Sequence, residues 1–170
     1  MDFFEIIRNR YSCKKFSDRI VEKEKLDQIL EAGRLAPTAK NLQEQHIYVI
    51  QTEEFLAKID KLTPCRYGAK TVLLIAFNKK NVFTYPGAKR DSGVEDTSIV
   101  ATHCMLAATA VGVDSCWINN FDPDMLAREF NLPEEEEVLM LLDLGYAAEG
   151  TGALPNHNLR KELQETVTYL

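Results

Sequence analysis

Apolar residues recur with helical spacing in the first part of the chain. The intervals 2–9 and 22–35 each place their apolar side chains on one face of a helix. The second helix should end before Pro37, because the residue ahead of a proline is disfavoured in the α region. Thr52 is a candidate N-cap for a further amphipathic helix over 53–62.

Short runs rich in apolar, β-branched and aromatic residues predict four strands. The predicted strands are His46–Gln51, Thr71–Phe77, Asp114–Ile118 and Val138–Leu144. The second run is almost wholly apolar, which is typical of a strand that is buried on both faces. This pattern predicts a sheet with at least one central strand.

The interval 93–111 is apolar around most of its helical circumference, and His103 and Cys104 are expected to be packing residues on it. Ser92-Gly93-Val94-Glu95 fits a capping box at its start, and Gly112 fits a left-handed stop at its end. A helix of this kind is expected to be central, packed against a sheet or against a second subunit.

Turn and cap residues mark the boundaries of the remaining helix and of the irregular segments. Asp122 followed by Pro123 predicts a cap and a helix over 123–130. Four segments are predicted to be irregular: the loop Pro37–Asn41, the connection 78–91, the acidic run Glu134–Glu137 as a solvated loop, and the tail 150–170, with a final strand or helix.

The order of these elements predicts an α+β protein with a mixed central β-sheet sandwiched between helices. The length of 170 residues is most simply one domain, residues 1–170. Strict alternation of strands and helices is absent, and so is a Gly-x-Gly-x-x-Gly turn, which argues against a Rossmann dinucleotide site.

Composition narrows the function classes further. The 20 basic and 26 acidic side chains give a net charge of −6, which argues against a general nucleic-acid-binding protein. The N-terminus lacks a secretory signal pattern and no apolar run is long enough for a bilayer, so a cytoplasmic protein without a membrane span is expected. Four scattered cysteines and three dispersed histidines predict reduced thiols and no metal site.

The segment Arg10-Tyr11-Ser12-Cys13-Lys14 goes against the acidic balance, since residues 8–15 hold four positive charges. Guanidinium, ammonium and hydroxyl donors on a turn are what a bound phosphate requires. The alternative is a solvated helix end, where cations also lie favourably against the helix dipole. From the segment alone both interpretations stay open.

Several separated motifs occur in register along the chain. They are Arg10–Phe16, Ala36-Pro37-Thr38-Ala39-Lys40-Asn41-Leu42-Gln43, Glu95–Ile99 leading into Gly112–Ile118 with Cys116-Trp117, Phe121-Asp122-Pro123, Leu144-Gly145-Tyr146, and His157-Asn158-Leu159-Arg160-Lys161. Together they resemble the FMN-dependent nitroreductase family, and in particular its short, single-domain members.

The resemblance implies a homodimer that carries FMN at the subunit interface. It also implies an NAD(P)H oxidoreductase that passes hydride or electrons from NADH or NADPH, through the flavin N5, to a nitroaromatic, quinone or similar small-molecule acceptor. The mechanism would be ping-pong, and no catalytic side chain is required because the cofactor performs the redox chemistry. A flavin-binding storage or redox-sensing protein without efficient turnover, and a non-flavin interaction domain, are the alternatives.

The resemblance also implies a role for each matching residue. Arg10 and Ser12 would contact the FMN phosphate with Tyr11 nearby, and Arg160 and Lys161 would return from the tail to the same phosphate. Lys14 would lie toward the pyrimidine edge of the flavin, where a cation stabilises the reduced anion. Residues reaching the ring from the other subunit would be Pro37, Thr38, Ala39 and Asn41. Residues passing the ring would be Trp117, Ile118 and Asn119, with a backbone N–H near Asn119 donating to N5.

Some positions depart from the family pattern or allow a simpler interpretation. The run Gln43-Glu44-Gln45-His46 stands where many members continue Gln-Pro-Trp, and Arg66 is a candidate for a pyrimidine-contacting lysine that has no clear match. Trp117 could equally be a core aromatic. Cys13 is expected to be a passive small residue, and His157 a tail histidine rather than an acid catalyst.

Overall fold

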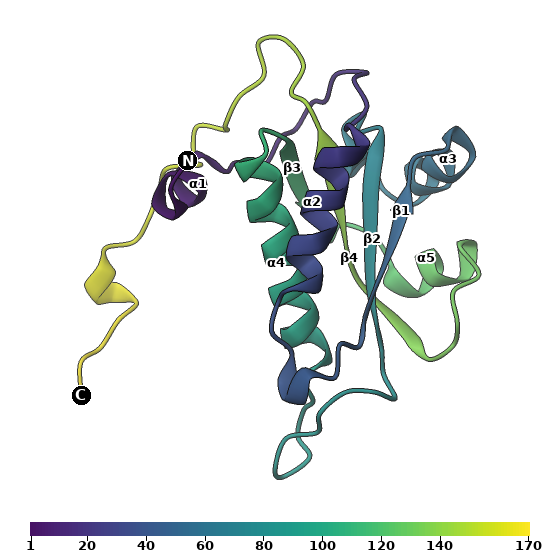
Figure 1. Cartoon of the computed structure of the whole chain (residues 1–170), viewed down its shortest axis with the longest axis vertical. Coiled ribbons are helices and arrows are strands. Elements are labelled where there is room, and N and C mark those ends of the chain that lie inside the picture. The colour runs from purple at the N-terminus through teal and green to yellow at the C-terminus, as the bar shows by residue number, and fades with distance from the viewer.

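The computed structural model describes all of residues 1–170 and shows one antiparallel sheet between two helical layers (Figure 1). The four strands are β1 (Gln45–Ile50), β2 (Thr71–Asn78), β3 (Asp114–Ile118) and β4 (Glu136–Gly145), in the order β1-β2-β4-β3. The helices are α1 (Phe3–Asn9), α2 (Lys23–Arg34), α3 (Glu53–Leu62), α4 (Gly93–Ala110) and α5 (Pro123–Glu129). The predicted α+β class is therefore confirmed.

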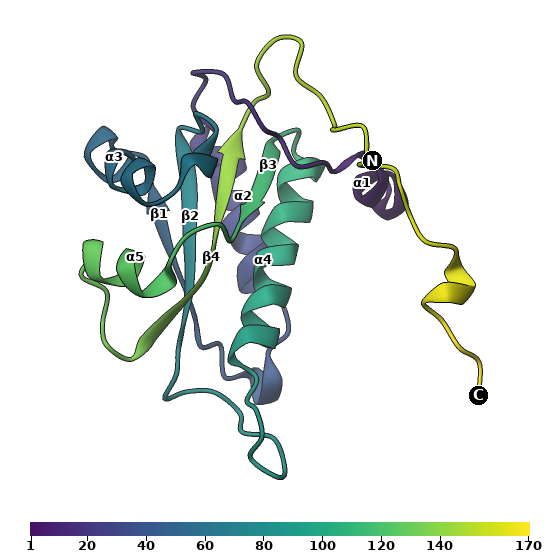
Figure 2. The same ribbon diagram turned by 180° about the vertical axis from the view of Figure 1, so that it is seen from behind.

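The two faces of the sheet carry separate apolar clusters, because successive strand residues point to opposite sides. On one face Leu73 and Leu142 pack with α2 and α4 through residues such as Ile29 and Cys104. On the other face Leu74 and its neighbours pack with α3 and α5. Figure 2 shows α3 and α5 on the side of the sheet away from α2. The helical sandwich that the sequence predicts is thus present.

Local signals in the sequence fix several element ends correctly. Gly112 adopts a left-handed conformation with φ +73° directly after α4, as predicted for a helix stop. The Asp122 side chain accepts hydrogen bonds from the backbone N–H groups of Asp124 and Met125, and Pro123 opens α5. All residues of β2 up to Phe77 are buried, as expected of a central strand.

Other expectations need correction. Every strand pair is antiparallel, and the parallel component of the expected mixed sheet is a single bridge between Ser12 and Ser115. Ser92 does not cap α4 with its side chain, because its hydroxyl accepts the Phe83 N–H at 3.1 Å. The run Glu134–Glu137 is not wholly a loop, since β4 begins at Glu136. His103 is exposed rather than packed.

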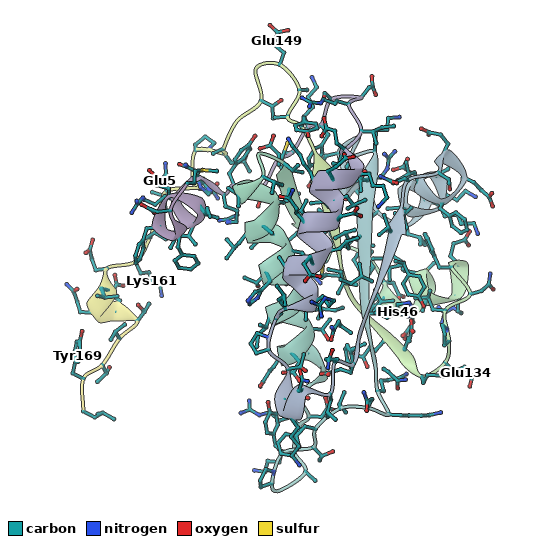
Figure 3. All side chains as sticks on the ribbon, viewed as in Figure 1. Glu5, His46, Glu134, Glu149, Lys161 and Tyr169 are labelled. Atoms are coloured by element: carbon teal, nitrogen blue, oxygen red, sulfur yellow. The ribbon has the colours of Figure 1, made fainter.

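The two ends of the chain stand away from the sheet (Figure 1). Helix α1 has no buried residue, and Phe3 and Phe4 are 61% and 63% exposed. The last twenty residues form an extended tail whose only regular element is a short 3-10 turn at Leu163–Glu165. Figure 3 shows the side chains of Lys161 and Tyr169 on this outlying segment. No helix in the chain is both long and apolar enough to span a bilayer.

Candidate phosphate pocket

The basic segment that follows α1 is extended up to Cys13, bends at Lys14 and Lys15, and runs along the start of β3. Ser12 forms a parallel bridge with Ser115, and the backbone N–H of Cys13 donates to the carbonyl of Ser115 at 2.9 Å. In an extended segment alternate side chains point to opposite sides. Arg10, Ser12 and Lys14 therefore share one side, while Cys13 is buried on the other.

The tail lies across the side that carries the cations. A cavity of about 320 Å³ is lined by residues from both ends of the chain: Arg10, Ser12, Lys14, Leu154, Asn156, His157 and Arg160. The sequence predicts four of these residues as binding residues, and the structure brings all four together. Arg160 lies more than a hundred residues after the other three, so the pocket depends on the tail folding back toward α1.

The positive charges in this cavity are not neutralised by the protein. Neither Arg10 nor Arg160 is paired with a carboxylate. The Arg160 guanidinium donates to the carbonyl of Leu159 at 2.7 Å and to that of His157. Two uncompensated guanidinium groups with a hydroxyl and an ammonium group form a donor set that suits a phosphate dianion.

Lys14 is a half-buried cation of the cavity, and other side chains hold its amine. Its Nζ lies 3.1 Å from Cys116 Sγ and 3.4 Å from the Tyr67 hydroxyl, and 4.6 Å from the centre of the Tyr67 ring. Burial alone would lower the pKa of Lys14, but the hydrogen bonds to Cys116 and Tyr67 outweigh it and raise the pKa above its ordinary value. The amine is therefore held as an ammonium ion at the inner wall of the cavity.

Behind Lys14 lies a carboxyl group that has no hydrogen-bond partner. Asp143 is 0% exposed, and neither of its side-chain oxygens meets a donor. It is in register with Cys116 on the neighbouring strand. Burial raises the pKa of Asp143 well above its ordinary value, against the opposing charges of Arg66 and Lys14. Nothing in the sequence pattern indicates a buried acid at this position.

Tyr11 does not line this cavity, because the alternation of the extended segment turns it away. It borders a smaller hollow of about 210 Å³ with Asp114 and Gly112. Burial raises the pKa of Tyr11, and the charge of Asp114 adds to this effect. The expected place of Tyr11 beside the phosphate residues is thus only approximate.

The loop Pro37–Asn41 lies at the other end of α4 from Arg10. The Ala39 N–H donates to Asp96 Oδ2 at 2.9 Å in the first turn of α4, whereas Arg10 borders the same hollow as Thr109 in the last turn. A helix of 18 residues is about 27 Å long. Pro37, Thr38, Ala39 and Asn41 are therefore not brought to the cavity of their own chain.

The residues expected beside the flavin ring are on or after β3. Ile118 is buried in the core, so its side chain is not available at the surface. The Trp117 indole N–H donates to the Asn119 side chain, and Asn119 Nδ2 donates to the carbonyl of Leu139 at 2.9 Å. Trp117 also packs against the apolar cluster between the sheet and helices α2 and α4, so it is a packing residue as well. Lys161 is exposed and does not line the cavity.

Two residues that sequence reasoning considered have other roles. Arg66 is held by Asp60, with Nε 2.7 Å from Oδ1, and its Nη1 donates to the carbonyl of Ala69 at 2.5 Å. It is therefore not free to replace the missing lysine. His46 pairs with Glu136 at 2.6 Å between Nδ1 and Oε1 and stacks on Tyr48 (Figure 3 labels His46). Conversely, Asn156 and His157 line the cavity, and their nearness to Arg160 in the sequence was the available signal.

Comparison with known proteins identifies the family of the chain. The model of the nitroreductase family matches residues 7–65 and 64–146. A provisionally named NADH dehydrogenase/NAD(P)H nitroreductase of Methanothermobacter thermautotrophicus is 31% identical over 160 residues, which cover 89% of this chain and 81% of that protein.

Solved structures show the same fold. A nitroreductase family protein from Clostridium difficile 630 superposes with a TM-score of 0.93 at 39% identity, over 99% of this chain and 98% of that one. A provisionally assigned nitroreductase from Exiguobacterium sibiricum, solved in complex with FMN, superposes with a TM-score of 0.87 at 23% identity, over 100% and 98% of the two chains. The chain described here belongs to the nitroreductase family.

Proposed function

We propose that this protein is an FMN-dependent NAD(P)H oxidoreductase whose single domain spans residues 1–170. The observation that carries the proposal is the cavity in which Arg10, Ser12 and Lys14 meet Arg160 without a neutralising carboxylate. The names of the relatives and the FMN bound to one structural neighbour support the same activity.

The cavity's donors fit the phosphate end of FMN. Arg10 and Arg160 would supply charge-assisted hydrogen bonds, and Ser12 a hydroxyl, to a dianion that must leave water on binding. Asn156 and His157 add further polar side chains from the tail. Lys161 would act only after a change in the tail, since it is exposed and outside the cavity.

When bound, the flavin supplies the transfer of hydride or electrons from NADH or NADPH to a nitroaromatic, quinone or similar acceptor in a ping-pong cycle. The protein's own part is to bind and orient. The Lys14 ammonium would face the pyrimidine edge and stabilise negative charge there. A backbone N–H near Asn119 would donate to N5, and no side-chain nucleophile or base is required.

A homodimer would complete the site. Pro37, Thr38, Ala39 and Asn41 lie far from the cavity of their own chain, so a second copy is needed to bring them to it. Apolar residues on α1 and the tail are exposed, among them Phe3, Phe4, Leu159 and Leu163, and a second copy would cover them. Both arguments support a dimer in which these outlying segments are covered.

The test is an anaerobic titration of FMN-loaded protein with NADH and with NADPH, followed by absorbance, and then by an acceptor panel. Bleaching of the flavin and its return on adding a nitroaromatic or quinone is the expected result. Bound flavin that no nicotinamide bleaches would indicate the storage or sensing alternative instead. Protein that stays colourless after FMN is supplied would contradict the proposal. Sedimentation of a stable FMN-loaded monomer would contradict the dimer.

A further inference from the structure

The connection between α2 and β1 is held in an unusual backbone conformation. Lys40, Asn41 and Gln43 have φ values of +50°, +56° and +53°. Residues other than glycine seldom occupy this left-handed region, and a segment that does so three times needs contacts that hold it there. Residues 38–44, called the α2–β1 loop below, include three of the positions proposed to reach the flavin.

The contacts that hold the α2–β1 loop come from α4 and from the end of β2. The Ala39 N–H donates to Asp96 Oδ2 at 2.9 Å, and the Asn78 N–H donates to the carbonyl of Glu44 at 2.9 Å. Asn81 Nδ2 donates to the carbonyl of Leu42 at 3.0 Å. The two ends of the loop are therefore tied at Asp96 and at Glu44.

The side chains of these two tie points meet in the interior. Glu44 is 4% exposed and Asp96 is 5% exposed, and their carboxyl groups lie within hydrogen-bonding reach of each other. Neither side-chain oxygen of Glu44 accepts a well-aligned hydrogen bond, and the Ser92 hydroxyl lies nearby. Two ionised carboxylates cannot share a buried position without a large cost, so one of them must hold a proton.

The proton belongs on Glu44. Asp96 lies in the first turn of α4, where the helix dipole favours its negative charge, and it accepts the Ala39 N–H. Burial, the largest cause, and the hydrogen bond and charge of Asp96 together raise the pKa of Glu44 to about 7. The coupling between the two groups means that the proton is a property of the pair.

The nearby cations do not neutralise the carboxyl groups of Glu44 and Asp96, because each cation has another partner. The Lys40 amine lies over the Phe83 ring, 4.4 Å from its centre. Arg90 pairs with Glu95 at 3.5 Å, and the Tyr85 hydroxyl donates to Glu95 as well. Neither Glu44 nor Asp96 forms an ion pair with a cation.

We infer that Glu44 and Asp96 share one proton, and that this shared proton positions the α2–β1 loop. Loss of the proton places two negative charges together and loosens the loop. The consequence for FMN rests on the proposed function: the loop would hold flavin less well as pH rises through the pKa of Glu44.

The sharing itself is tested on FMN-free protein by amide hydrogen exchange of peptides that cover the loop. Glu44→Gln keeps a neutral donor to Asp96 at every pH, and exchange in the wild type is divided by exchange in this variant at each pH. We expect a ratio near one below about pH 6, and a rise of up to about tenfold per pH unit above about pH 7. A ratio that stays at one across the whole range would overturn the inference.

A second variant allows the same test if Glu44→Gln does not fold. In Asp96→Asn the amide can donate to an ionised Glu44 and still accept the Ala39 N–H, so the loop should stay protected at high pH. Glu134→Gln, at an exposed position, is the matched control and should follow the wild type. Exchange in Asp96→Asn that rises with pH as in the wild type would contradict the shared proton.

A separate arm measures FMN dissociation constants against pH for the wild type and Glu44→Gln. Ionisation of the FMN phosphate affects both proteins alike and cancels in the ratio. We expect the wild type to lose affinity relative to the variant above about pH 7. A pH-dependent loop with a constant affinity ratio would leave the shared proton standing and overturn the loop's assignment to the flavin. Failure of both proteins to bind FMN would overturn the proposed function alone.

Discussion

The amine of Lys14 lies 3.1 Å from the sulfur of Cys116, although the two residues are 102 positions apart in the chain. This contact fixes a flexible side chain at the inner wall of the cavity, with the Tyr67 hydroxyl 3.4 Å away on its other side. An ammonium group that is already ordered loses little side-chain entropy when a ligand meets it.

Lys14→Met should lower the reduction potential of bound FMN. Under the proposed function the ammonium stabilises the reduced, anionic flavin more than the oxidised form, and one hydrogen bond to a charged group contributes about 1.5–3 kcal/mol. For a two-electron couple this corresponds to a fall of roughly 30–60 mV. Spectroelectrochemical titration measures it, with Lys15→Met at an exposed neighbouring position as the control. Equal reduction potentials in the two variants would contradict the placement of Lys14 at the pyrimidine edge of the flavin.

Arg10→Ala and Arg160→Ala should each weaken FMN binding by about 10–100-fold, since each removes a charge-assisted contact to the phosphate. The double variant should bind FMN little better than riboflavin. Fluorescence titration with both ligands separates the phosphate contribution from the ring contribution, and Lys15→Ala is the control for net charge. Unchanged FMN retention in the double variant would refute the phosphate assignment of the cavity.

Gly33→Ala should destabilise the contact between α2 and α4. A Cβ atom at Gly33 would lie 2.6 Å from Cys104 Sγ, which is closer than side chains tolerate. We expect a loss of about 1–3 kcal/mol in the free energy of unfolding. Adding Cys104→Ala should recover at least about 1 kcal/mol, because the new methyl group then fills the space of the sulfur.

Urea denaturation of the two single variants and the double variant measures this coupling. Gly152→Ala is the control, since a Cβ atom there meets nothing within 4 Å, and it should change stability by less than about 0.5 kcal/mol. Additive effects of the two substitutions would mean that Gly33 and Cys104 do not compete for the same space.

Asp143→Asn should flatten the pH dependence of stability. The folded state raises the pKa of Asp143, so its contribution to stability is fully present below its ordinary range and is lost as pH rises through the raised pKa. The wild type should therefore lose stability relative to the variant with rising pH, by at most about 1.4 kcal/mol per pH unit. Denaturant titrations at several pH values measure this, with Asp18→Asn at an exposed site as the control. Parallel curves for the wild type and Asp143→Asn would contradict the raised pKa.

Much of the fold could be predicted because it depends on local signals. The stop at Gly112 and the cap at Asp122 require only the residues next to them, and the burial of β2 follows from its apolar composition. The failed capping box at Ser92 shows the limit of such signals. Its hydroxyl is used by the Phe83 N–H, nine residues earlier, and the local motif cannot show that competitor.

The candidate site could be predicted only in part, because its geometry depends on distant pairing. The bridge between Ser12 and Ser115 makes the basic segment extended, and this decides that Ser12 and not Tyr11 faces the cavity. The buried acid Asp143 was missed, since a carboxyl group within an apolar strand gives no periodic signal. The pairing of Arg66 with Asp60, six residues earlier on α3, depends on the turn between them and is not visible in the sequence.

The cavity joins the first and last segments of the polypeptide. An anion held by Arg10 and Arg160 together acts as a removable crosslink between the chain ends, comparable in its effect on chain entropy to a disulfide that closes a very long loop. Binding of the anion and attachment of the tail are then thermodynamically coupled. Inorganic phosphate alone should consequently protect the tail from proteolysis, before any aromatic ring is present.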